Sequence, residues 1–322
     1  MSNPRKDGSP TVLVIMASYN GEKYIAEQIE SILSQEAVDV TLRICDDGSI
    51  DSTPAICEAF ASKYANVYFE INKTNKGLAK NFMDMVYDDA SQGYDFYAFS
   101  DQDDVWLPEK LIHAVREIES RAASNEPALY YSDIENVGRD LSGGFREYAS
   151  WSGCSHELVA VLTVNWASGC TMVFNPAMRS RILAYEPSSY ARNHDGWVHL
   201  VAMVSGTVID DLDNSYIKRR ISGENQVGQR DLEITESLGG IARRWTHVFK
   251  KSMHCQTQVA ECLLEGYAKV MNKDDARLVE TYASMPRSFH ARIKVASTLI
   301  ACPFPTKSMA FSMACKAIFN RL

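Results

Sequence analysis

The sequence predicts an α/β protein in which a mostly parallel sheet is flanked by helices and followed by a helical C-terminal region. Over residues 11–121, short apolar runs alternate with amphipathic stretches, the pattern of right-handed β-α-β units. Polar clusters follow three of these runs, at the strand ends where such sheets bind ligands. From about residue 231 onward the pattern is helical, with no strand signal of comparable strength.

Alternating strands and helices account for the first 121 residues. The strand at Thr11–Ser18 is a continuous apolar run, typical of a strand buried on both faces. Pro54 and Pro108 stand near the start of predicted helices, where a missing N–H is tolerated. The other elements are strands at Thr41–Cys45, Asn66–Ile71 and Tyr94–Ser100, and helices at Gly21–Gln35, Ser52–Tyr64, Leu78–Ala90 and Glu109–Arg121.

The regularity loosens after residue 121. Strands are expected at Ala128–Ile134 and Gly169–Phe174, a helix at Asn193–Ser205, and a Gly/Ser-rich loop at Gly138–Ser155. A change in pattern near residues 220–230 divides the chain into a catalytic domain at 1–228 and a helical region at 229–322.

Three polar clusters are expected to face one crevice at the carboxyl edge of the sheet. They are Ser18–Gly21, Asp46–Ser49 and Asp101–Asp104. Alternate carboxylates at a strand end can converge on a hard cation such as Mg²⁺ or Mn²⁺, which prefers oxygen ligands. The alternative for the last cluster is an acidic turn in which Asp104 caps the next helix.

The turn after the second strand also has two interpretations. Asp47-Gly48 is a common turn signal, and Ser49 or Asp51 could cap the following helix. The functional interpretation is that a carboxylate here accepts a hydrogen bond from a ring N–H of a nucleotide base.

Composition excludes several classes of protein. The chain has 322 residues, a net charge of −8 and 46% apolar residues, which excludes a disordered chain and argues against a nucleic-acid partner. No apolar run approaches the ~20 residues of a membrane span, and no secretory signal is visible. Eight cysteines without zinc spacing predict free thiols in a reducing, cytoplasmic compartment.

Four ordered motifs carry a resemblance to a known family. They are Ala17–Gly21 (ASYNG), Cys45–Ser49 (CDDGS), Asn75–Asn81 (NKGLAKN) and Phe99–Trp106 (FSDQDDVW). Together they resemble the family 2 glycosyltransferases, and among these the bacterial rhamnosyltransferase-type enzymes of surface polysaccharide synthesis. The resemblance runs from Thr11 to about Gly228, and it implies a GT-A fold, a nucleotide-sugar donor and a divalent metal.

The resemblance also implies roles for individual residues. Asp103 falls on the direct ligand of Mg²⁺ or Mn²⁺ and Asp195 on the catalytic base. A base acting on an acceptor hydroxyl implies direct displacement with inversion. The donor side is assigned to Ala17, Tyr19, Asp47, Lys80, Asn81, Asp101 and Arg220, and the acceptor side to Trp106, Ser168, Gly169, His194 and Trp197. The alternative for Asp195 is a cap at the start of a helix.

One position departs from the family pattern. Where the family often has a histidine that completes the metal site, after the last core strand, this chain has Ser222. A serine is a much weaker ligand, so the metal is expected to depend on Asp103, the donor diphosphate and water, or on Glu224 from the same loop. The implied reaction is rhamnosyl transfer from dTDP-rhamnose, or transfer from UDP-glucose or UDP-galactose, to a lipid-linked saccharide.

Other functional classes are less consistent with the sequence. A nucleotidyltransferase would need a Gly-rich, basic loop after the first strand, which Ser18–Gly21 does not supply. A binding module would not need a carboxylate at Asp195, whereas a non-catalytic assembly subunit is not excluded by any motif.

The C-terminal region predicts a helical appendage that packs on the core or on a second copy of the chain. Residues 281–322 contain six cations and no Asp or Glu. On a helical wheel, Phe311, Cys315, Ile318 and Leu322 form one apolar stripe. A basic amphipathic helix of this kind either lies in a membrane interface or packs on the core with a solvated face. The first interpretation places the protein at the inner face of the cell membrane.

Overall fold

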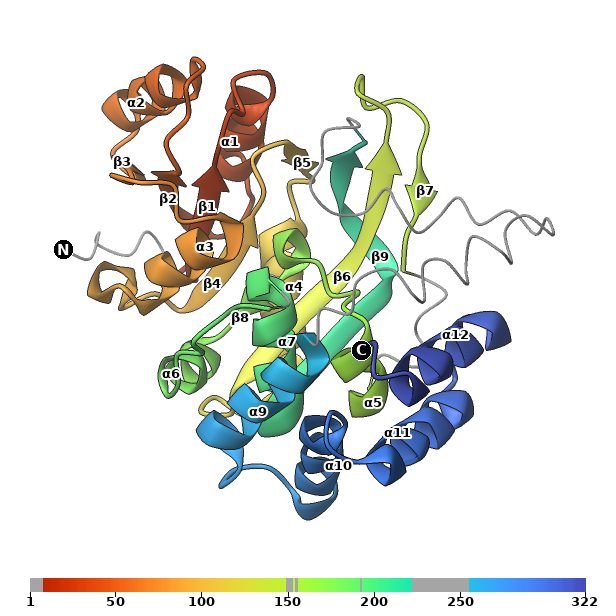
Figure 1. Ribbon diagram of the computed structural model, residues 1–322. Helices are drawn as coiled ribbons and strands as arrows, with labels where there is room; N and C mark the ends of the chain where they lie inside the picture. Colours follow the sequence, from red (N-terminus) through yellow and green to blue (C-terminus); the bar gives the residue numbers. More distant parts are fainter. Residues whose placement is uncertain (1–7, 149–152, 154–155, 192, 222–254) are drawn as a thin grey trace.

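The structure is a computed structural model that describes residues 8–148, 153, 156–191, 193–221 and 255–322. Its first half confirms the predicted alternation. The strands β1 (Thr11–Ser18), β2 (Asp39–Asp46), β3 (Val67–Ile71) and β4 (Phe96–Ser100) are parallel in the order β3-β2-β1-β4. The helices α1 (Ile25–Leu33), α2 (Thr53–Lys63) and α3 (Leu78–Tyr87) connect them, and Figure 1 shows this half of the sheet in red and orange.

The second half of the sheet is mixed. It continues from β4 through β8 (Val173–Phe174), β6 (Ala128–Val137), β9 (Thr207–Arg220) and β5 (Asp104–Trp106), and β7 (Phe145–Arg146) pairs with β6. Only β6 and β9 run parallel here. The expected strand at Gly169–Phe174 is reduced to β8, because residues 169–171 form a single 3₁₀ turn in which the Thr171 hydroxyl donates to the carbonyl of Ser168.

The two faces of the sheet carry separate apolar cores. Val12 and Val14 of β1 face one core, with α1, α2 and α4 (Lys110–Arg121). Leu13 and Ile15 face the other core, which α3, α5 (Leu158–Thr163), α6 (Pro176–Leu183) and α7 (Asn193–Ser205) cover. The alternation along β1 is the period-2 consequence of the pleat, and it explains the continuous apolar run.

Helices follow the sheet, as the sequence predicts. They are α9 (Cys255–Tyr267), α10 (Lys273–Ser284), α11 (Phe289–Ala301) and α12 (Lys307–Ile318), and their buried residues join the same core as α7. The predicted domain boundary at residue 228 lies outside the described residues. Among the helices that the structure describes, none is both long and apolar enough to cross a bilayer.

A three-residue segment connects distant strands of the sheet. The chain leaves the middle of the sheet at Ser100, the end of β4, and re-enters it at Asp104, the start of β5 at the edge. In a flat sheet these strands would lie four spacings apart, ~19 Å, whereas four Cα steps reach at most ~14 Å. The sheet therefore curls so that β5 approaches the end of β4.

Candidate active site

The loop after β1 is held to the acidic loop after β4 by one amide side chain. Gln102 accepts a hydrogen bond from the Tyr19 backbone N–H (2.9 Å) and donates to the Tyr19 carbonyl (3.0 Å). Gly21 is required beneath it, because a Cβ there would lie 2.3 Å from Oε1 of Gln102. Two of the three predicted strand-end clusters are therefore in direct contact.

The loop after β2 is joined to the same edge. Asp46 accepts hydrogen bonds from the Ser18 hydroxyl (2.9 Å) and the Ser49 N–H (2.7 Å). Asn20 adopts a left-handed conformation (φ 49°), and its side chain accepts from the N–H of Ile50 (3.0 Å). All three predicted clusters thus meet at one edge of the sheet, as the strand-end rule indicates.

Asp47 is only 4% exposed, and it organises the loop before α3. Its Oδ1 accepts from the Asn72 amide (3.0 Å) and the Lys76 N–H (2.8 Å), and its Oδ2 accepts from the Gly77 N–H (2.8 Å). A carboxylate has about four acceptor positions. These bonds leave one position on Asp47 for a further donor such as a base N–H.

The acidic loop contains three carboxylates of unequal environment. Burial and then the charges of Asp103 and Asp195 raise the pKa of Asp101 to about 7. Burial also raises the pKa of Asp103 and places that of Asp104 well above its usual value. Asp104 begins β5 and caps no helix, so the capping alternative is wrong.

Asp104 lies deepest in this loop. It is fully buried, and no N–H or O–H group of the described residues donates to its oxygens, although the Cys170 thiol interacts with them. Ligand atoms of Asp101, Asp104 and Cys170 lie within 4.8 Å of one another. The two carboxylates are the oxygen donors that Mg²⁺ or Mn²⁺ prefers, whereas the Cys170 thiol is a soft donor that these ions do not favour. Asp103, the predicted ligand, is not a member of this group.

Two arginines at the end of β9 support the acidic loop from behind. Arg219 donates to Asn136 (2.8 Å) and Glu147. Burial raises the pKa of Asp101, Asp103 and Asp104, and the positive charge of Arg219 offsets part of that rise. Arg220 is 2% exposed, and it donates to the Asp103 carbonyl (3.0 Å) while pairing with Glu27. Arg220 thus positions the loop backbone, so its predicted place on the donor side is corrected.

Asp195 lies in the first turn of α7, across from the acidic loop. Its Oδ2 accepts from the Gly169 N–H (3.3 Å), and its Oδ1 accepts from the Gly196 N–H (2.7 Å). Asp195 binds the N–H of Gly169, and the sulfur of the next residue, Cys170, lies within 4.8 Å of a carboxylate oxygen of Asp101. Asp195 and Asp101, 94 positions apart in the chain, are therefore near neighbours in space. The Tyr148 hydroxyl reaches Ser168 (3.2 Å) on the same loop as Gly169.

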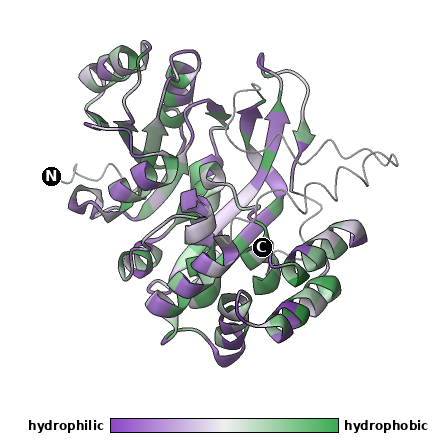
Figure 2. Cartoon of the chain, viewed as in Figure 1, coloured by the Kyte–Doolittle hydropathy of each residue, from purple (hydrophilic) through white to green (hydrophobic). Residues whose placement is uncertain are grey.

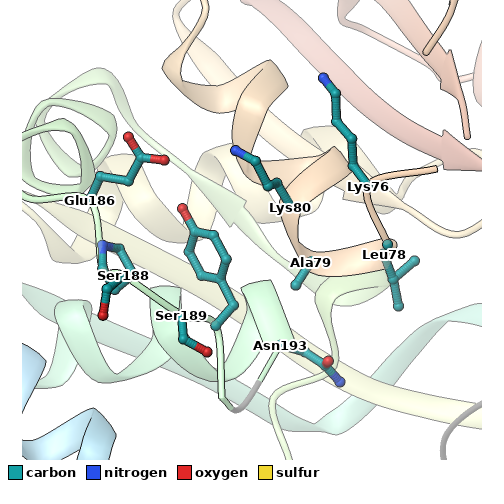
Figure 3. Close-up of a pocket in the computed structure, with 11 residues that line it drawn as sticks. Lys76, Leu78, Ala79, Lys80, Glu186, Ser188, Ser189 and Asn193 are labelled. Carbon is teal, nitrogen blue, oxygen red and sulfur yellow. The ribbon is translucent and has the colours of Figure 1, made fainter. Parts of the chain in front are cut away.

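A cavity of about 640 Å³ opens between α3 and the segment before α7. Lys76 and Lys80 line it from one side, and Glu186, Tyr190 and Asn193 line it from the other, as Figure 3 shows. Both lysines also pair with Asp84. The predicted residue Lys80 is therefore on an open surface two positions from the start of α3 and close to the segment that leads to Asp195.

Three predicted acceptor residues are in the interior. Trp106 is 2% exposed, and the Lys110 ammonium lies 3.7 Å from its ring centre. His194 stacks on Phe82 with ring centres 4.0 Å apart, and burial lowers its pKa to about 3. Trp197 is also buried, and it packs against tyrosines at positions 185 and 267. None of the three forms an open acceptor wall, because the cores on either side of the sheet enclose them.

The remaining predictions have mixed outcomes. Asn81 is 1% exposed and donates to the Cys45 carbonyl (2.9 Å), so it supports β2 from beneath, and Ala17 is 7% exposed at the end of β1. Tyr19 is 45% exposed, and its backbone is bound to Gln102. Ser222 lies outside the described residues. Sequence reasoning missed Asp104 and Cys170 as members of the candidate metal group, although Asp104 directly follows the predicted Asp-x-Asp pair.

Comparison with known proteins agrees with this arrangement. Residues 13–174, half of the chain, match the sequence model of glycosyl transferase family 2. A dTDP-rhamnosyl transferase, RfbG of Shigella flexneri, is 42% identical over 102 residues, which are 31% of this chain and 35% of RfbG. The chain thus spans about a third of that relative. Glycosyltransferase GlyG of Streptococcus pneumoniae is 25% identical over 80% of this chain and 82% of its own.

Solved structures confirm the fold class. S. aureus TarS 1–349 superposes with a TM-score of 0.55 at 15% identity, covering 97% of this chain and 89% of TarS. This likeness confirms the expected GT-A class with its C-terminal helices. Since the family model covers half of the chain and includes three of the strand-end motifs described above, the chain belongs to glycosyl transferase family 2.

Proposed function

We propose that the protein transfers a sugar from a nucleotide-diphosphate donor to a hydroxyl group by direct displacement with inversion. One observation carries this proposal: Asp195 is bound to Gly169, whose neighbour Cys170 lies within 4.8 Å of Asp101, so a distant part of the chain brings Asp195 close to the acidic loop. A base on one side of a bound sugar and a charged leaving-group site on the other is the arrangement that inversion requires.

In this proposal Asp195 accepts the proton of the acceptor hydroxyl as that oxygen attacks the anomeric carbon. Its hydrogen bonds from Gly169 and Gly196 fix the carboxylate and stabilise its ionised form. General-base assistance of this kind is worth ~10²–10⁴-fold in rate. The bond from Gly169 also holds the loop that contains Ser168 and Gly169 against the start of α7.

The donor is held at the edge formed by the three strand-end loops. Asp47 receives a base N–H at its remaining acceptor position, and Tyr19 lies beside it. Asp103, together with the neighbouring carboxylates Asp101 and Asp104, would hold Mg²⁺ or Mn²⁺, and such an ion would supply positive charge at the diphosphate leaving group. Ser222 is proposed to contribute little to this metal because a hydroxyl is a weak ligand.

We favour rhamnose as the sugar and a lipid-linked saccharide as the acceptor. The printed name of RfbG supports the first choice, and a teichoic acid biosynthesis protein of Bacillus subtilis, GgaA, 34% identical over 103 residues, supports a cell-surface acceptor. A lipid-linked acceptor places the reaction at the cytoplasmic face of the membrane. UDP-sugar donors are the second candidate, since TarS was also solved with UDP-GlcNAc.

The experiment is a panel of radiolabelled donors, dTDP-rhamnose, UDP-glucose and UDP-galactose, offered with a lipid-linked acceptor. We expect one donor to give product. Asp195→Asn should lower turnover by ~10²–10⁴-fold and leave donor affinity unchanged. Asp213→Asn, an exposed aspartate on β9, is the matched control. Near wild-type turnover by Asp195→Asn would show that the base is elsewhere, and no product from any donor would favour a binding or assembly role.

A further inference from the structure

Helices α11 and α12 form a hairpin with an unusual apolar surface. We define it as residues 287–321, and Figure 1 shows its two helices side by side in dark blue. It contains five of the thirteen exposed large apolar side chains among the described residues, in about a tenth of the chain. They are Phe289 (65% exposed), Ile293, Ile300 (60%), Phe311 (59%) and Phe319.

These side chains are ordered along the helices. Phe289, Ile293 and Ile300 lie within about 40° of one another around α11, at 100° per residue. On α12 the predicted stripe of Phe311, Cys315 and Ile318 is at least partly exposed. The alanines at 310, 314 and 317 lie on the adjacent face, about 100° around the helix, and are buried in the core. Leu322 is 4% exposed, so its predicted place on the outer stripe is wrong.

Cations accompany the apolar surface. Arg287, Lys294, Lys307, Lys316 and Arg321 belong to the hairpin, and none of them forms an ion pair with another described residue. Residues 281–322 contain no Asp or Glu, whereas the chain as a whole has a net charge of −8. Hydrophilic and hydrophobic segments alternate along both helices in the colouring of Figure 2.

We propose that this hairpin docks the protein onto an anionic phospholipid surface. Contiguous exposed apolar side chains mark an interaction site, and their basic neighbours specify an anionic partner. A second copy of the chain is a poorer occupant, since a symmetric dimer through this face would bring two cationic surfaces together. The proposal deepens the proposed function in that it names the surface on which a lipid-linked acceptor is met.

The hairpin is connected to the acceptor side of the site. Helix α11 packs on α5, and α5 leads directly into the segment that contains Ser168 and Gly169. Tyr282 of α10 also reaches α5, since its hydroxyl donates to the Val159 carbonyl (3.1 Å). A docked hairpin would therefore fix the acceptor loop relative to the lipid surface through α5.

The test is sedimentation of the full chain with phosphatidylcholine vesicles, with and without phosphatidylglycerol, in the absence of donor and acceptor. We expect binding only with the anionic lipid, and less of it at high NaCl concentration. Lys307→Gln with Lys316→Gln should lower the partition coefficient about 25-fold, about five-fold per cation. Phe289→Ser with Phe311→Ser should lower it tenfold or more.

Two variants on the far half of the sheet serve as controls, and thermal melting verifies that every variant folds. Tyr68→Ser, at a side chain 54% exposed on β3, is the control for the apolar substitutions. Lys63→Gln, at the end of helix α2, is the control for the loss of positive charge. Equal binding to neutral and anionic vesicles, equal losses in the controls, or no binding would overturn the proposal. Vesicle binding needs no catalysis, so the two proposals fail separately. Sugar transfer without vesicle binding would refute the docking surface alone. Vesicle binding without sugar transfer would refute the proposed function alone.

Discussion

The two hydrogen bonds between Gln102 and the Tyr19 backbone clamp the loop after β1 to the loop after β4. Replacing Gly21 by alanine tests whether this clamp supports donor binding. The new Cβ would lie 2.3 Å from Oε1 and 2.5 Å from Cδ of Gln102, so the amide must move. Moving it breaks the two hydrogen bonds to Tyr19, at 2.9 and 3.0 Å. Each such bond is worth about 0.5–1.5 kcal/mol net, and solvent replaces part of this because Tyr19 is 45% exposed.

We therefore expect a loss of about 1–2 kcal/mol, which corresponds to a 5- to 30-fold weaker affinity for the donor nucleotide. Isothermal titration calorimetry with dTDP or UDP and Mn²⁺ measures it. Gly153→Ala is the control, since its Cβ would meet no atom of the described residues closer than 3.6 Å.

A double-mutant cycle with Gln102→Ala sharpens the test. Both changes act through the same amide, so Gly21→Ala should cost little once Gln102 is absent. An undiminished cost in the Gln102→Ala background would refute the clamp, as would unchanged affinity in Gly21→Ala alone.

Three further predictions concern the loop support and the core. Arg220→Met removes the hydrogen bond to the Asp103 carbonyl. We expect Mn²⁺-dependent binding of the donor nucleotide to weaken by about 1.5–3 kcal/mol in calorimetry, and unchanged binding would mean that the acidic loop keeps its conformation without Arg220. His194 stays neutral in the folded state because burial lowers its pKa to about 3, whereas the unfolded value is about 6.5. The unfolded state therefore binds more protons between these values, and stability falls by about 1.4 kcal/mol per pH unit as the pH drops below 6.5. Urea titrations should show a shallower fall for His194→Phe, and parallel pH curves would contradict the assignment. Gly206→Ala would place a Cβ 2.6 Å from the Pro127 carbonyl oxygen, a backbone atom, and should destabilise the fold by about 1–3 kcal/mol in the same assay.

The sequence was sufficient for the first half of the sheet. Residues 11–18 and 96–100 are buried on both faces, so their strands appear as unbroken apolar runs. Strand β9 was not predicted, because its buried residues are spaced three, five and three positions apart and do not alternate with exposed ones. That spacing follows from register shifts against β6 near Ser132 and Asp133, which no local pattern reveals.

The same distinction applies to the site. The strand-end rule brings together the loops that contain Asp47 and Asp101, because chain topology alone places them at one edge. The aromatic residues were misassigned, because residue type does not show which side of a strand or helix faces solvent. Trp106 lies under the Lys110 ammonium, and His194 lies against Phe82, and both contacts depend on long-range packing.

The three residues between β4 and β5 give the site a fixed dimension. Since Asp101, Gln102 and Asp103 alone connect the centre of the sheet to its far edge, the length of this segment sets how closely the two halves approach. Substitutions within it change charge, whereas a single inserted residue would add ~3.5 Å to the connection. Engineering of this enzyme should therefore treat the acidic loop as a spacer of set length and seek altered specificity in the flanking loops.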